Sequence, residues 1–121
     1  MFDHQKLDVY RIAVEFATWA YRLARGIPKA ERSMRDQWLR AAQSIPLNIA
    51  EDNGRRTSAD RLKFFGIARG SALECAAILD LLVSFGLSDM EAVKPGVELL
   101  HREVSMLSKM VGVGKDRKSS P

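Results

Sequence analysis

The sequence has few of the residues from which most catalytic, metal and disulfide sites are built. Its 121 residues include one cysteine, Cys75, and two histidines, His4 and His101. One cysteine cannot form an intramolecular disulfide, which fits a reducing compartment, so we expect a cytoplasmic protein. No uncharged apolar run reaches the roughly 18 residues that a membrane span needs, and the first residues, MFDHQKLDVYR, do not resemble a signal peptide. We therefore expect no association with a membrane.

The motifs that could carry chemistry are incomplete. Glu98 and His101 have the E-x-x-H spacing of di-iron helical bundles, but the sequence contains no second E-x-x-H motif. Gly114-Lys115 resembles the end of a phosphate-binding loop, but Lys109 stands where the first glycine of that loop is required. We therefore predict that the protein is not an enzyme and that it has no cofactor and no metal site.

Helical periodicity is the main signal that the sequence does contain. Hydrophobic residues make up 46% of the chain, which is enough for the core of one domain. They recur at spacings of three and four residues in four segments, and no alternation typical of strands is present. The sequence predicts an all-α, up-down-up-down four-helix bundle over residues 1–113, with helices at about 6–25, 30–53, 58–85 and 89–112. A disordered basic tail is predicted at 114–121.

The fourth predicted helix has one clear apolar seam and a possible N-terminal cap. Ser88 is followed three residues later by Glu91, which is the pattern of a capping box. Apolar residues then follow at helical spacing. The predicted core face of this helix consists of Val93, Val97, Leu100, Val104, Leu107 and Val111.

The first predicted helix carries more apolar surface than one bundle requires. Beside its core seam lies a second apolar strip, formed by Tyr10, Val14, Ala17, Tyr21 and Ala24. A monomer would expose such a strip, and large exposed apolar patches usually mark interfaces. We therefore predict a homo-oligomer, without assigning the strip that forms the subunit interface.

Pro46 lies in the middle of the second predicted helix and leaves two alternatives open. Proline lacks an N–H and disfavours a helical conformation at the preceding residue. Either a loop falls at Ser44–Pro46, or one helix continues with a kink. The apolar phase from Ala41 through Ile45 to Ile49 is unbroken, and this favours the kinked helix.

Polar residues accompany the core faces of the second and third predicted helices. Glu74 lies at the edge of an apolar arc, where a carboxylate needs a polar partner. We predict a structural polar network and keep a ligand-binding or catalytic role for Glu74 as the alternative. The network would consist of Arg40, Ser44, Asn48, Glu51 and Glu74.

Positive charge concentrates in two segments that the predicted topology brings to one end of the bundle. Residues 55–69 hold five basic and one acidic residue, and residues 106–121 hold four basic and one acidic residue. Such a basic end attracts phosphate backbones without reading base sequence. The alternative is a solvated helix end. The candidate nucleic-acid-binding residues are Arg55, Arg56, Arg61, Lys63, Lys115, Arg117 and Lys118.

Three stretches of the sequence resemble the signature of a known family. LRAAQSIPLNIAED, GRR and FFGIARGSALE are similar to segments of the four-helix-bundle proteins named for intervening sequences in bacterial 23S rRNA genes. The resemblance extends from about Val9 to Leu107. It departs at Asp52, where the family usually has glycine. The matching residues are Arg40, Ser44, Ile45, Pro46, Asn48, Ile49, Ala50, Glu51, Gly70, Ser71 and Glu74.

This resemblance implies a four-helix bundle that assembles into a homopentamer and has no known enzyme activity. The family that the sequence resembles also includes relatives that serve diversity-generating retroelements. These relatives are basic pentamers that work with nucleic acid and a reverse transcriptase. The sequence thus favours a nonenzymatic, homo-oligomeric protein that binds RNA or DNA through its basic end. The alternative is a scaffold that binds a partner protein and no nucleic acid.

Overall fold

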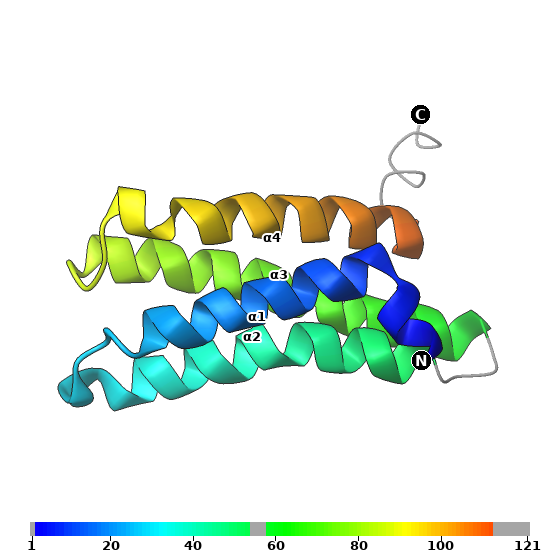
Figure 1. Ribbon diagram of the computed structural model, residues 1–121, viewed down its shortest axis with the longest axis horizontal. Helices are drawn as coiled ribbons and strands as arrows, with labels where there is room; N and C mark the ends of the chain where they lie inside the picture. The colour runs from blue at the N-terminus through cyan, green and yellow to red at the C-terminus, as the bar shows by residue number, and fades with distance from the viewer. Residues whose placement is uncertain (1, 54–57, 113–121) are drawn as a thin grey trace.

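Long helices account for most of the chain in the computed structural model (Figure 1), which describes residues 2–53 and 58–112. Within these ranges there are four α-helices and no β-strand, so the all-α prediction is confirmed. The predicted tail at 114–121 lies outside the described residues. The elements are η1 (Asp3–Lys6), α1 (Asp8–Ala24), η2 (Lys29–Glu31), α2 (Arg32–Asn53), α3 (Ser58–Ser84) and α4 (Met90–Val111).

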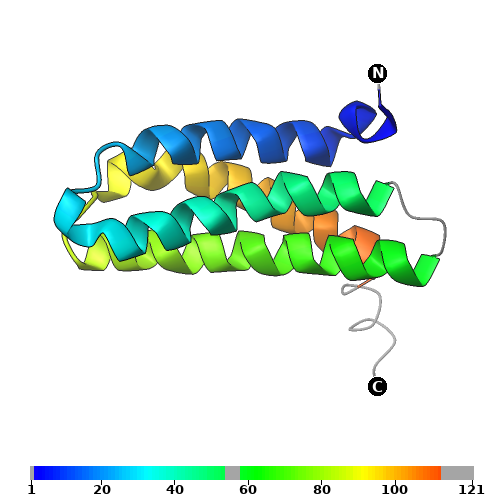
Figure 2. The same ribbon diagram turned by 90° about the horizontal axis from the view of Figure 1, so that it is seen from below.

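The four α-helices lie side by side, and each packs against two others. α1 packs against α2 and α4, and α3 also packs against α2 and α4. The face between α1 and α2 is therefore opposite the face between α3 and α4. The connections from α1 to α2 and from α3 to α4 lie at one end of the molecule (Figures 1 and 2). α2 ends, α3 begins and α4 ends at the other end, where the described part of the N-terminus also lies.

Aromatic side chains from α1 and α2 fill the centre of the core. The ring centroid of Phe16 is 5.8 Å from that of Trp19 and 5.8 Å from that of Trp38. Trp38 is fully buried, and its indole Nε1 donates a 2.9 Å hydrogen bond to the carbonyl oxygen of Ala20. This bond satisfies the only polar atom of the side chain, so the whole indole contributes to the apolar core.

The second predicted helix is continuous through its proline. α2 runs from Arg32 to Asn53 with Pro46 inside it, so the alternative of a loop at Ser44–Pro46 is wrong. Pro46 is itself buried, and Ile45 and Ile49 on either side are fully buried. The proline removes one backbone hydrogen bond of the helix. Burial of the surrounding apolar side chains offsets this loss, because it stabilises a helix more than propensity does.

The core face of α4 differs from the predicted seam. Its buried positions are Val93, Gly96, Leu100, Glu103 and Leu107. Val97 and Val104 of the predicted seam are half-buried and pack against the edge of the core. A glycine and a glutamate carry no hydrophobic signal, and the pattern therefore favoured the neighbouring valines.

The N-terminal cap of α4 also lies one residue further along the chain than predicted. Asp89 is the N-cap, and its carboxylate Oδ1 accepts a 2.8 Å hydrogen bond from the backbone N–H of Ala92. The capping box predicted at Ser88 and Glu91 is therefore wrong. A carboxylate at this position accepts from one otherwise free N–H group, and its negative charge interacts favourably with the positive end of the helix dipole.

Candidate functional site

The predicted basic end is described only in part. Lys63 is exposed, and its Nζ lies 5.7 Å from the ring centroid of Phe64. Lys109 is exposed in the last turn of α4, at the same end of the bundle (Figure 1). Arg61 belongs to the first turn of α3. The other candidates, Arg55, Arg56, Lys115, Arg117 and Lys118, lie outside the described residues.

Asp52, where the sequence departs from the family signature, connects α2 to α3. Its side chain is fully buried, and Oδ2 accepts a 2.8 Å hydrogen bond from the backbone N–H of Phe65. This hydrogen bond joins the last turn of α2 to the second turn of α3.

A polar groove of about 290 Å³ lies between α2 and α3, and we call it the α2/α3 groove. Ser71 Oγ donates to Ser44 Oγ at 2.8 Å, and Gln37 Nε2 donates to Glu74 Oε2 at 3.3 Å. Both bonds connect the two helices. The groove is lined by Gln37, Arg40, Ala41, Ser44, Ser71 and Glu74.

The residues of the predicted polar network are placed unequally. Arg40, Ser44 and Glu74 line the α2/α3 groove together. Asn48 bonds within α2 instead of across it, because its Nδ2 donates to the backbone oxygen of Ser44 at 2.8 Å and to Ser44 Oγ at 2.9 Å. Glu51 is exposed near the end of α2. Gln37, which bonds to Glu74, was not among the predicted residues of the network.

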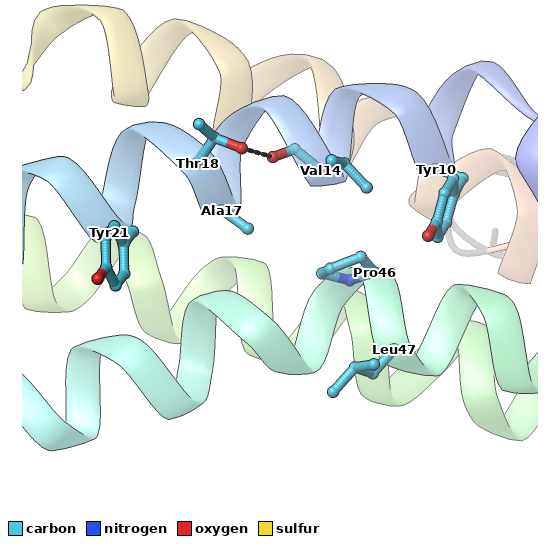
Figure 3. A pocket seen from close by; sticks show the side chains of 7 residues that line it. All are labelled: Tyr10, Val14, Ala17, Thr18, Tyr21, Pro46 and Leu47. Carbon is cyan, nitrogen blue, oxygen red and sulfur yellow. Dashed lines mark hydrogen bonds between the residues drawn. The ribbon is translucent and has the colours of Figure 1, made fainter.

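An apolar groove of about 350 Å³ lies between α1 and α2 on the outer surface (Figure 3), and we call it the α1/α2 groove. Three of its apolar side chains are exposed: Val14 by 40%, Tyr21 by 58% and Leu47 by 66%. Thr18 Oγ1 donates to the carbonyl oxygen of Val14 at 2.9 Å, so its hydroxyl is satisfied within α1. The groove is lined by Tyr10, Val14, Ala17, Thr18, Tyr21, Pro46 and Leu47.

A second apolar groove, of about 220 Å³, lies on the opposite side of the bundle between α3 and α4. Leu73 at its edge is 44% exposed. The half-buried Val97 and Val104, which were predicted for the core, contribute to this groove. We call it the α3/α4 groove, and it is lined by Leu73, Ala76, Val97, Leu100, His101 and Val104.

The core between α3 and α4 contains a carboxyl group that the sequence analysis missed. Glu103 is fully buried, and neither of its carboxyl oxygens has a hydrogen-bond partner among the described residues. Burial raises the pKa of this carboxyl to about 8. Burial also raises the pKa of the Cys75 thiol above its ordinary value, and the carboxylates of Glu103 and Glu74 add to this rise. The sequence held one signal for the burial of Glu103, because it lies three residues after Leu100 and four before Leu107, on the same face of the helix.

The part of the chain that the structure describes offers no arrangement for metal chemistry. Over residues 2–53 and 58–112, no three side chains of His, Cys, Asp or Glu lie together as metal ligands would. Glu98 and His101, which have the E-x-x-H spacing, are both exposed. None of the described helices combines the length and the apolar character needed to cross a membrane.

Two comparisons place this chain among known proteins, whereas no curated protein sequence matches it. One solved structure covers 85% of this chain and 97% of its own, with a TM-score of 0.80 and 24% sequence identity. It is a protein of unknown function from the S23 ribosomal protein family of Bacteroides thetaiotaomicron, and the likeness concerns the fold. The family model of the 23S rRNA-intervening sequence protein matches residues 5–110. The chain therefore belongs to the 23S rRNA-intervening sequence protein family.

Proposed function

We propose that this protein is a nonenzymatic homo-oligomer that binds nucleic acid through the basic end of an up-down-up-down bundle. The observation that carries the proposal is the meeting of three chain segments at one end. The last turn of α2, the first turn of α3 and the last turn of α4 share that end (Figures 1 and 2). The basic segments 55–69 and 106–121 are continuous with these turns in sequence.

The two apolar grooves support the assembly part of the proposal. They differ in composition and lie on opposite sides of the bundle, so one copy's α1/α2 groove can meet the next copy's α3/α4 groove. Such a contact uses two different patches and closes into a ring when the rotation between copies permits. The resemblance to pentameric relatives favours a homopentamer. A parallel ring would bring the basic ends of all subunits to one side.

Binding to nucleic acid is tested with mixed RNA and DNA fragments over a series of salt concentrations, on protein whose mass in solution is measured in parallel. We expect the logarithm of the binding constant to fall linearly with the logarithm of the salt concentration, because neutralised phosphates release counterions. The slope counts the phosphates engaged. Absence of binding at low salt would exclude a nucleic-acid-binding basic end.

Charge reversal distinguishes the basic end from general positive charge. We expect the double variant R55E/R56E to lose most of its affinity and to keep its mass in solution. The matched control is R22E/R25E. Arg22 and Arg25 are exposed where α1 ends, and this end of the bundle is opposite the basic end. Equal losses in both variants would attribute binding to net charge, and dissociation of R55E/R56E would place these arginines in the subunit interface.

A protein-interaction scaffold is the second candidate, and the exposure of Leu47 and Tyr21 in the α1/α2 groove favours it. In that case a different protein, instead of a second copy, covers the groove. A monomer at micromolar concentration that binds no nucleic acid would support the scaffold and exclude the homo-oligomer.

A further inference from the structure

The α2/α3 groove presents two opposite charges that do not neutralise each other. Arg40 and Glu74 both line it and are both exposed. The ion pairs among the described residues are Arg11 with Asp8 and Arg35 with Asp36. No guanidinium nitrogen of Arg40 lies within 4 Å of a carboxylate oxygen of Glu74, so these two residues form no ion pair. Each therefore keeps charged atoms for another partner.

The hydroxyl groups in the floor of the groove leave one donor unused. A serine hydroxyl has one hydrogen to donate and two lone pairs that accept. Ser44 Oγ accepts from Asn48 Nδ2 at 2.9 Å and from Ser71 Oγ at 2.8 Å. The bond between the two serines uses one hydroxyl hydrogen, whichever serine donates, and no other acceptor among the described residues takes the second hydrogen. This hydrogen is available to a negatively charged group beside Arg40.

The acceptors of the groove gather around the carboxylate of Glu74. Its Oε2 receives one hydrogen bond, from Gln37 Nε2 at 3.3 Å, and a carboxylate accepts about four hydrogen bonds. Gln37 Oε1 is a further acceptor on the same wall. A positively charged group with several N–H donors would satisfy these oxygens.

The two charges together select the class of ligand. A simple anion would gain the donors of Arg40 and Ser44 but would be repelled by Glu74, and a simple cation would be repelled by Arg40. A volume of about 290 Å³ is at the small end of ligand cavities. We infer that the α2/α3 groove binds a free α-amino acid, with its carboxylate at Arg40 and Ser44 and its ammonium group at Glu74 and Gln37.

This inference does not depend on the nucleic-acid proposal. The groove residues of α2 lie between Gln37 and Ser44, in the middle of α2 and away from its last turn at the basic end. Loss of nucleic-acid binding would therefore leave the groove unaffected, and loss of amino-acid binding would leave the basic end unaffected.

Ligand-observed saturation-transfer NMR on the full chain tests the inference with three matched probes. L-Alanine carries both charges, propionate lacks the ammonium group and ethylamine lacks the carboxylate. We expect saturable binding of L-alanine and at least ten-fold weaker binding of the other two probes. Absence of saturable L-alanine binding, or equal binding of propionate, would overturn the assignment.

Charge-neutralising variants locate the binding in the groove. We expect R40Q and E74Q each to weaken L-alanine binding at least ten-fold. The matched controls are R32Q on α2 and D80N on α3, because Arg32 and Asp80 are exposed and outside the groove. Melting temperatures show whether each variant is folded. If E74Q is unstable, R40Q still tests the site, because Arg40 is exposed and its replacement should not disturb the core. Unchanged affinity in R40Q would exclude this site.

Discussion

The indole ring of Trp19 in α1 lies directly on Gly96 in α4. A Cβ atom at position 96 would stand 2.7 Å from Trp19 Cε3 and would overlap Cζ3 and Cη2 of the same ring. Gly96 is buried, and Trp19 also contacts Phe16 and Trp38 at centroid distances of 5.8 and 6.2 Å. The missing side chain at position 96 therefore makes room for the aromatic cluster between α1 and α4.

G96A is expected to destabilise the fold, although alanine forms helices better than glycine. The added methyl group must displace a ring that is held by two aromatic neighbours, and overpacking of this kind costs about 1–3 kcal/mol. Thermal and denaturant unfolding measure the loss.

The matched control for G96A is G70A in α3. A Cβ at Gly70 meets no atom within 4 Å, so the gain in helix propensity of roughly 0.5–1 kcal/mol should appear there. Equal effects of the two substitutions would contradict the close packing of Trp19 on Gly96.

Glu103 is expected to make stability depend on pH. In the unfolded chain its carboxyl ionises near the ordinary pKa of 4.5, whereas burial raises the folded pKa to about 8. The stability contributed by the protonated form is complete below pH 4.5 and is lost as the pH rises towards 8. The slope reaches up to about 1.4 kcal/mol per pH unit.

Denaturant unfolding at several pH values checks this expectation in E103Q, which cannot ionise at this position. The difference in free energy of unfolding between the original chain and E103Q should change from pH 4.5 to 8 and be constant above that range. E98Q is the control, because Glu98 is exposed on the same helix. A constant difference across the range would show that Glu103 does not titrate in this window.

Asp52 is expected to stabilise the contact between α2 and α3. D52A removes the buried carboxylate that accepts from the backbone N–H of Phe65, and a hydrogen bond contributes about 0.5–1.5 kcal/mol to stability. D52N keeps an oxygen that can accept the bond and should be less destabilising than D52A. Denaturant midpoints rank the variants, with Q43A as a control at an exposed position of α2. If D52A matched Q43A, the hydrogen bond would contribute nothing to stability.

Leu47 is expected to belong to the subunit interface. L47D places a charge in the α1/α2 groove, where association would have to desolvate it, so assembly should weaken while the monomer stays folded. Light scattering measures the mass, and circular dichroism measures the helix content. M90D is the matched control, because Met90 is 71% exposed and lines neither apolar groove. An unchanged mass in L47D would exclude the α1/α2 groove as the interface.

Local patterns in the sequence were sufficient to predict the four helices. Apolar spacing predicted four helices and no strand, and the unbroken phase around Pro46 favoured a helix through that residue over a loop. These features depend on neighbours within one or two turns, so they can be read along the chain. The candidate site was harder to predict from the sequence, because the hydrogen-bond partners of Asp52 and Glu74 lie on another helix.

The sequence by itself determined the all-α class, the family signature and the clustering of basic residues in two segments. Only the tertiary structure decided that Glu103 and Gly96 belong to the core, that Asp52 accepts a hydrogen bond from Phe65, and that Gln37 bonds to Glu74. The reason is physical. The class of secondary structure follows from short-range periodicity, whereas burial of a carboxyl group or absence of a side chain is specified by the neighbouring helix that occupies the space.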